Sequence, residues 1–130
     1  MGQCYNNYLI IKVTDEQGAK NVLRSKIEPL SYGESQAEAC GVDLNTLYGL
    51  LQYFFGDWEN SFRLTIEPKT WKGFAKYTSA FDASYSWENV MIQTFCQLAP
   101  YLADRSSLKI YPDSGEDYLR VKDGKAEWIR

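Results

Sequence analysis

SLKIYPDSGEDYLRVKDGKAEWIR, which occupies residues 107–130, is the stretch that decides the C-terminal part of the fold. Asp123 and Gly124 lie between two runs of alternating residues, which is typical of a two-residue hairpin loop, because both turn positions need positive φ. Such a loop fixes the strand register, so Leu119 is expected opposite Trp128. With SLKIY before the polar turn, the stretch predicts a three-stranded antiparallel meander. We expect Trp128 to be buried against the helix that precedes this meander.

The segment before the meander predicts that helix. It begins near residues 84–86 and ends at Ala99, because Pro100 cannot continue it. Upstream of it, spaced aromatic residues predict a short helix over residues 69–77. Apart from Phe81, residues 78–83 are small or polar, which is typical of a loop.

The N-terminal part predicts a strand followed by a helix. Residues 8–13 form a short β-branched run that is apolar on both faces, so we expect a strand at the centre of the sheet. A capping-box pattern that starts at Thr14 predicts a helix to about Lys26. Pro29 then stops this helix.

The middle of the chain predicts further helices and one more strand. Residues 34–40 favour two helical turns, and residues 43–55 favour a stronger, well-buried helix that Asp43 caps and Gly56 ends. Residues 61–67 alternate between apolar and polar side chains, which indicates a half-buried strand.

Length and element order indicate the fold class. The chain has 130 residues, which fits one domain. Strands and helices are partly segregated along the sequence, and this segregation indicates an α+β fold. We therefore predict a single α+β domain over residues 1–130, with a mostly antiparallel sheet and a C-terminal three-stranded meander packed by several helices.

Composition and charge narrow the classes of function. The net charge is −3 with acidic and basic residues interspersed, so no nucleic-acid partner is expected. No apolar run approaches the ~20 residues of a membrane span, and no apolar segment follows the N-terminus as it does in a signal peptide. Cys4, Cys40 and Cys96 are odd in number and far apart, which indicates reduced thiols in a cytoplasmic protein.

The residue types of common catalytic and metal sites are missing. The chain has no His, which excludes His-based triads and HExxH zinc sites. It has neither a phosphate-binding glycine loop nor a CxxC pair, so we expect no cofactor and no metal. The acidic turn from Asp113 to Asp117 is interpreted as a solvated loop that keeps a sheet edge soluble, with a cation site as the alternative.

Two stretches resemble a known group of proteins. Residues 1–7 read MGQCYNN and lead straight into a strand, which resembles the Trp-Cys-x-Asn openings of small ferredoxin-like plasmid proteins of the YubB type. Gln3 stands where those proteins have Trp. Residues 98–104 read LAPYLAD and are similar to tails of small proteins from bacterial mobile elements. The resemblance implies an accessory protein of a plasmid, phage or integrative element, and it carries no catalytic residues with it.

Aromatic residues gather between positions 71 and 87 and motivate the functional hypothesis. Tyr and Trp are favoured at protein interfaces. We predict a non-catalytic protein-interaction domain, an inhibitor or regulator, whose contact surface includes Trp71, Lys72, Lys76, Tyr77 and Tyr85. In this interpretation the phenol rings lie at the surface, and the lysines of a short helix steer an acidic partner toward them.

Two alternatives stay open. One is a small enzyme that pairs Glu67 or Glu88 with a Tyr hydroxyl as acid and base. The other is a purely structural subunit of an oligomer, which includes a homo-oligomer. Convergent buried carboxylates in a concave pocket favour the enzyme, whereas a flat aromatic patch favours the binding domain.

Overall fold

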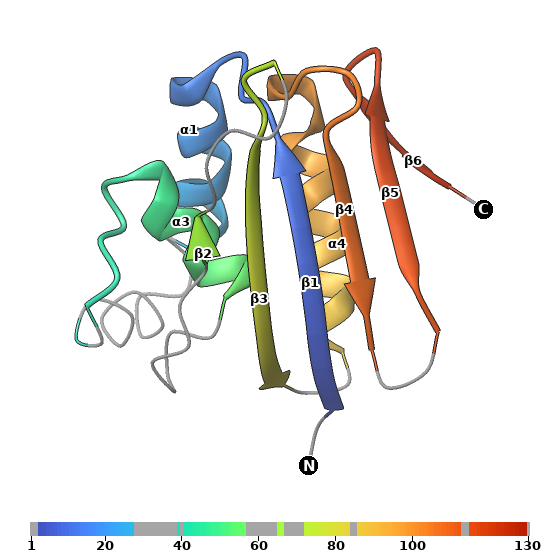
Figure 1. The fold of residues 1–130 in the computed structure, drawn as a ribbon. Coiled ribbons are helices and arrows are strands. Elements are labelled where there is room, and N and C mark those ends of the chain that lie inside the picture. Colours follow the sequence, from blue (N-terminus) through green and yellow to red (C-terminus); the bar gives the residue numbers. More distant parts are fainter. Residues whose placement is uncertain are drawn as a thin grey trace.

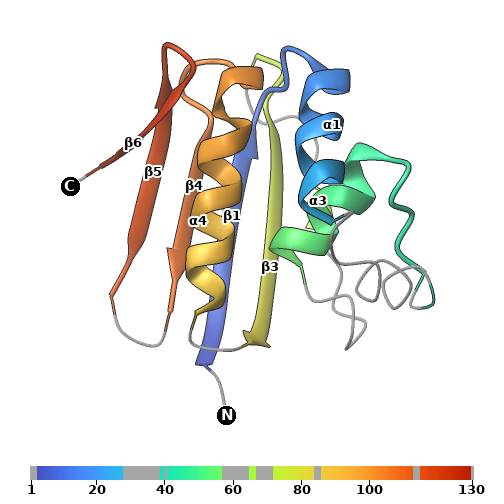
Figure 2. The ribbon, with the colours of Figure 1, turned by 180° about the vertical axis from the view of Figure 1, so that it is seen from behind.

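In the computed structural model, helices cover one face of a six-stranded sheet (Figures 1 and 2). The structure describes residues 3–27, 39, 41–56, 65–66, 72–83, 86–112 and 115–129. The strands are β1 (Gln3–Ile11), β2 (Thr65–Ile66), β3 (Ala75–Ala83), β4 (Ser107–Tyr111), β5 (Asp117–Lys122) and β6 (Lys125–Trp128). The helices are α1 (Glu16–Ile27), α3 (Leu47–Phe55) and α4 (Trp87–Leu98), and a 3₁₀ turn (Ala99–Tyr101) follows α4.

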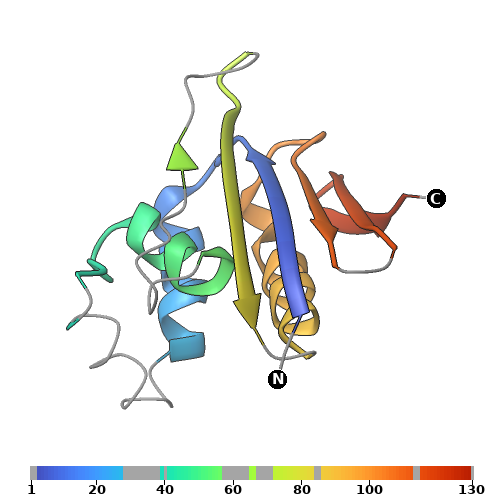
Figure 3. The same cartoon turned by 60° about the horizontal axis from the view of Figure 1, so that its bottom comes forward.

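The strand order is β2-β3-β1-β4-β5-β6, and every neighbouring pair runs antiparallel. The first four strands and the helices α1 and α4 follow one another as β-α-β-β-α-β, with β3 placed between β1 and β2, which is a split β-α-β arrangement. In the tilted view of Figure 3, the β5–β6 hairpin lies at one end of the sheet and α1 and α3 at the other. The α+β class, the antiparallel sheet and the C-terminal meander are confirmed.

The central position predicted for the first strand is also confirmed, since β1 pairs with β3 on one side and β4 on the other. The described helices cover one of its two faces. Tyr5, Leu9 and Ile11 are buried toward the helices, whereas Tyr8 on the opposite face is 37% exposed. Ile10 is the one aliphatic side chain of the run 8–13 on that opposite face.

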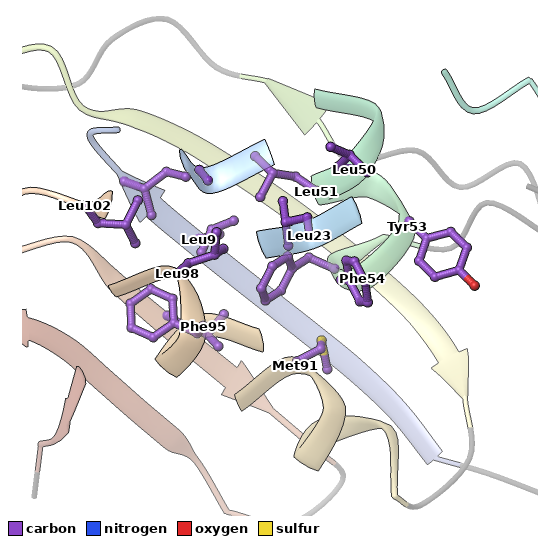
Figure 4. Close-up of a cluster of buried hydrophobic side chains, with 14 of the residues drawn as sticks. Leu9, Leu23, Leu50, Leu51, Tyr53, Phe54, Met91, Phe95, Leu98 and Leu102 are labelled. Carbon is purple, nitrogen blue, oxygen red and sulfur yellow. The ribbon is translucent and has the colours of Figure 1, made fainter. Parts of the chain in front are cut away.

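The core lies between β1 and the helices (Figure 4). Phe95 and Leu98 of α4 and Leu23 of α1 are almost fully buried together with Leu9 of β1. α1 and α4 each contribute one apolar face to this layer, which is how amphipathic helices gain most of their stability. α3 is buried at every residue from Gly49 to Phe55, which confirms the prediction of a well-buried helix.

A chain of buried polar groups fastens the end of α3 to the sheet. The Asn7 side-chain amide donates to Ser79 Oγ at 3.0 Å, and Ser79 Oγ donates to the Phe55 carbonyl at 2.6 Å. Asn7 Oδ1 is buried without a hydrogen-bond partner. These bonds link β1, β3 and the C-terminal end of α3.

The helix predicted over residues 69–77 and the loop predicted over residues 78–83 are wrong where the structure describes them. Residues 75–83 form β3, which pairs with β1 along its full length. Tyr77 and Phe81 face the helices at a spacing that strands also satisfy, and Ser79 between them is polar because it bonds the Phe55 carbonyl. The small and polar residues that suggested a loop are therefore strand residues.

Two helix starts differ from the sequence prediction. Asp15 rather than Thr14 caps the N-terminus of α1, because its carboxylate accepts a hydrogen bond from the Gly18 N–H at 3.0 Å. Thr46 rather than Asp43 is the N-cap of α3, and its hydroxyl oxygen accepts from the backbone N–H three residues on. Both helices thus begin later than predicted. The ends at Gly56 and near Pro100 are confirmed.

Several predictions lie outside the described residues. They include the helical turns over residues 34–40, except position 39, most of the strand over residues 61–67, and the stop at Pro29. Of the strand, Thr65 and Ile66 are described, and they pair with Thr78 and Tyr77.

The predicted hairpin register is confirmed, but the predicted burial of Trp128 is wrong. Asp123 and Gly124 have φ of 51° and 76°, as the two-residue loop requires, and Leu119 is the Cα partner of Trp128. Trp128 is nevertheless 48% exposed. β6 is the outermost strand of the sheet, so it has a neighbouring strand on one side only.

Replacement of Trp128 by alanine is therefore expected to lower the free energy of unfolding by less than about 1 kcal/mol, since surface substitutions have small effects. Burial against α4 would instead cost about 3–5 kcal/mol. Urea unfolding of the variant and the wild type decides between these values. A loss in the larger range would show that Trp128 is packed into the core.

Candidate functional site

The strands separate their side chains into two sets, because successive residues of a strand point to opposite faces. One set is buried beneath the helices, and none of the described helices lies on the opposite face (Figures 1 and 2). We call this second surface the open face. Its described side chains are Cys4, Asn6, Tyr8 and Ile10 of β1, Lys76, Thr78 and Ala80 of β3, Ser107, Lys109 and Tyr111 of β4, Tyr118, Arg120 and Lys122 of β5, and Lys125 and Glu127 of β6.

Tyr8 stands at the middle of the open face. Its Cα pairs with Thr78 of β3 and Lys109 of β4. Its ring meets the ring of Tyr111 edge to face, with centroids 5.7 Å apart and an interplanar angle of 85°. Lys76 Nζ lies 5.8 Å from the centroid of the Tyr8 ring. Tyr8 therefore contacts both an aromatic ring and a cation.

A second contact between a tyrosine ring and a lysine lies farther along the sheet, on β4 and β5. Lys109 of β4 and Tyr118 of β5 are Cα partners, and Lys109 Nζ lies 4.6 Å from the centroid of the Tyr118 ring. This distance is within the range of a cation–π interaction. Tyrosine and lysine side chains thus alternate across four adjacent strands, β3, β1, β4 and β5.

The open face is basic although the whole chain has a net charge of −3. Glu127 is its acidic residue among the described side chains, and it pairs in register with Arg120. Asp82 pairs with Cys4 at the far end of β3. The basic side chains are Lys76, Lys109, Arg120, Lys122 and Lys125.

A pocket of about 590 Å³ adjoins the open face where β4 begins and β5 ends. The Arg105 N–H donates to the Val121 carbonyl at 2.9 Å, which holds the turn before β4 against β5. The Asp104 carboxylate accepts from the Asp123 N–H at 2.9 Å. The residues that line this pocket are Asp104, Arg105, Arg120, Val121 and Lys122. Three cationic side chains and one acidic side chain therefore surround the pocket.

Of the predicted partner-binding residues, the structure describes Lys72, Lys76 and Tyr77, and it places Lys76 and Tyr77 on opposite faces of the sheet. Lys76 lies on the open face, whereas Tyr77, its neighbour in β3, points to the helix layer. Lys72 is exposed in the turn before β3, with φ of 48°. Lys76 therefore does not share a helical side with Lys72. Trp71 and Tyr85 lie outside the described residues.

Tyr77 and Cys96 have raised pKa values, which make this phenol and this thiol poor nucleophiles. Burial raises the pKa of Tyr77, and nearby Tyr48 and Glu16 raise it further, so this phenol keeps its proton at neutral pH. Desolvation also raises the pKa of Cys96, although its side chain is exposed on α4. Because the thiolate is the reactive form, Cys96 is a weak nucleophile. Neither Cys4 nor Cys96 forms a disulfide.

Glu88, in the first turn of α4, forms a carboxyl pair with Asp117 at the start of β5. Burial raises the pKa of Glu88, and the hydrogen bond with Asp117 and the charge of Asp117 raise it further. This pair is the described arrangement that comes closest to the carboxylate chemistry of the enzyme alternative. Neither carboxylate lines the basic pocket, and Glu67 lies outside the described residues.

Within the described residues, no group of three or more His, Cys, Asp or Glu side chains is placed to hold a metal ion. The helices described here are all too short or too polar to cross a membrane. Comparisons with protein-family models, with curated proteins and with solved structures find no match for the chain. Because a fold alone does not define a function, the open face and its pocket are the features that bear on function.

The tyrosines of the open face are absent from the predicted site. For Tyr111 and Tyr118 the sequence does carry a signal, which is the alternation of buried and exposed residues in predicted strands. In SLKIY, Lys109 and Tyr111 alternate with buried Leu108 and Ile110, and the same alternation separates Tyr118 from Leu119. What the sequence does not show is that β1 lies next to β4, which brings Tyr8 to Lys109. That neighbour relation depends on topology, and it assembles the site.

Proposed function

We propose that this chain is a non-catalytic binding domain that holds a macromolecular partner on the open face of its sheet. The observation that carries the proposal is the row of alternating tyrosine and lysine side chains over four strands, on a face that the described helices leave uncovered. Aromatic rings provide contact area at a low cost in side-chain entropy, and cations provide steering and specificity.

The chemistry of the described ionisable groups supports binding over catalysis. A catalytic nucleophile or base usually has a pKa that its surroundings shift toward the pH at which the enzyme works. Here the pKa values of Tyr77 and Cys96 move away from neutrality, and neither residue lines the basic pocket. The pair of Glu88 and Asp117 is the observation on which the enzyme alternative rests.

The partner class expected from the sequence is another protein, with the chain as an inhibitor or regulator encoded on a bacterial mobile element or phage. Its support is the resemblance of residues 1–7 to ferredoxin-like plasmid proteins, and the split β-α-β topology is compatible with that resemblance. A cytoplasmic location belongs to the same proposal. The contact surface, however, is proposed on the open face and no longer on the segment from Trp71 to Tyr85.

Capture from a bacterial lysate by the immobilised protein tests the proposal with two charge-reversal variants. Lys109→Glu inverts a charge near the middle of the open face, whereas Lys20→Glu makes the same change on α1 in the helix layer. We expect the macromolecules retained by the wild type to be lost with Lys109→Glu and kept with Lys20→Glu. Equal retention by both variants would place the contact surface elsewhere and contradict the proposal.

A further inference from the structure

We infer that the partner of the open face is single-stranded nucleic acid, with bases stacked on tyrosine rings and phosphates held by the lysine and arginine side chains beside them. This inference rests on the proposed function, because it names the partner of the same surface. It departs from the expectation drawn from net charge, since the charge that a ligand meets is that of the face it binds.

The tyrosines provide stacking positions. Tyr8, Tyr111 and Tyr118 belong to three adjacent strands, and all three project from the side of the sheet opposite the described helices. Every nucleobase has a flat π face, so an exposed aromatic ring binds bases with little sequence preference. A sheet face presents such rings to unstacked bases, which only a single strand offers.

The lysines are placed for the phosphates that connect those bases. Lys76 Nζ lies over the Tyr8 ring, and Lys109 Nζ lies over the Tyr118 ring. A nucleic-acid strand alternates bases with phosphates, and the open face alternates rings with ammonium groups. When a base stacks on the ring, the flexible lysine side chain can turn its ammonium group toward the adjoining phosphate.

The basic pocket continues this pattern along β5. Tyr118 and Arg120 are two residues apart on the same face of the strand, and Arg120 lines the pocket together with Arg105 and Lys122. Arginine binds phosphate through two parallel hydrogen bonds. The acidic side chain in the lining, Asp104, already accepts a hydrogen bond from the Asp123 N–H. The pocket therefore suits a phosphate group next to a stacked base.

Other partners fit the open face less well. A duplex hides its bases and is read by elements that enter a groove, whereas the tyrosines stand on a broad sheet surface. A second copy of the chain would set two basic faces against each other. An acidic protein segment would satisfy the lysines and gain contact area from the tyrosines, but its carboxylate side chains have no aromatic face to stack on the rings.

Fluorescence anisotropy with labelled oligonucleotides of about 12 residues tests the inference, since single-strand sites span about 4–16 nucleotides. The probes are oligo(dT), oligo(U), a duplex of the same length and a poly-glutamate peptide of the same charge. We expect both single strands to bind more tightly than the duplex and the peptide. The two single-strand probes distinguish DNA from RNA as the preferred source of the same chemistry.

Variants separate stacking from charge. Tyr8→Ala should weaken single-strand binding by about tenfold and leave its salt dependence unchanged. Lys109→Ala should weaken binding and reduce the slope of log K against log salt by about 0.7, the value for one phosphate contact. Trp128→Ala, which removes an exposed ring from the other face of the sheet, should bind as the wild type does. Tyr118→Ala repeats the stacking test if Tyr8→Ala unfolds at a lower temperature.

Three results would overturn the inference: no binding of either single strand, equal binding of the duplex, or no effect of Tyr8→Ala and Tyr118→Ala in folded variants. Equal or tighter binding of poly-glutamate would overturn it as well. These failures are distinguishable from failure of the proposed function. If Lys109→Glu still abolishes capture of a protein from lysate, the open face remains the contact surface and only its partner changes.

Discussion

Truncation of Phe95 to alanine is expected to remove about 3–5 kcal/mol from the free energy of unfolding. Phe95 is fully buried on α4 and lies in the same core cluster as Leu9 of β1 and Leu98 (Figure 4). The loss combines the transfer free energy of a large ring with the cavity that it leaves. Since small domains are stable by only about 5–15 kcal/mol, this single change should shift the urea midpoint strongly.

Gln97→Ala is the matched control for Phe95→Ala. Gln97 is exposed on the same helix, so its replacement should change the free energy of unfolding by no more than about 0.5 kcal/mol. If Phe95→Ala and Gln97→Ala unfold at the same urea concentration, α4 does not pack on the sheet as described.

Replacement of Gly49 by alanine should destabilise the protein by about 1–3 kcal/mol or more, which is the cost of overpacking. Helix propensity alone predicts the opposite sign, because alanine in a helix is favoured over glycine by about 1 kcal/mol. A Cβ at Gly49 would collide with the backbone carbonyl of Asp43. That carbonyl also accepts hydrogen bonds from the N–H and the hydroxyl of Thr46, the N-cap of α3, so the clash disturbs the whole start of the helix.

Gly18→Ala provides the comparison for Gly49→Ala. Gly18 lies in α1, and its added Cβ would meet side-chain atoms of Tyr101 and Asp15. Side chains can move aside where a backbone carbonyl cannot, so Gly18→Ala should cost less than Gly49→Ala. Thermal unfolding of both variants measures the difference. A stabilised Gly49→Ala variant would show that the turn before α3 is not formed as described.

Local patterns predict the parts of this fold that are specified by neighbours in sequence. The hairpin register follows from Asp123 and Gly124, and the end of α4 follows from Pro100. β3 is not predictable in the same way, because the aromatic spacing of Tyr77 and Phe81 fits a helix or a strand. Only pairing with β1 decides between them, and this pairing is a tertiary interaction.

The candidate site could not be predicted from the sequence for a related reason. A net charge of −3 with interspersed signs suggests that no surface is basic. The period of two along each strand sorts these charges, however, and places Lys76 and Lys109 on one face. A sequence read without strand neighbours does not show that Tyr8 and Lys109 lie side by side.

The central claim is that the open face is the contact surface, and NMR of the tyrosine rings tests it most directly. The wild-type protein, labelled with ¹³C in its tyrosine rings, is titrated with single-stranded oligonucleotide. We predict that the ring signals of Tyr8, Tyr111 and Tyr118 shift with a common saturation, whereas those of Tyr5 and Tyr77 beneath the helices do not. Shifts confined to rings of the helix layer, with the three open-face rings unchanged, would contradict this account.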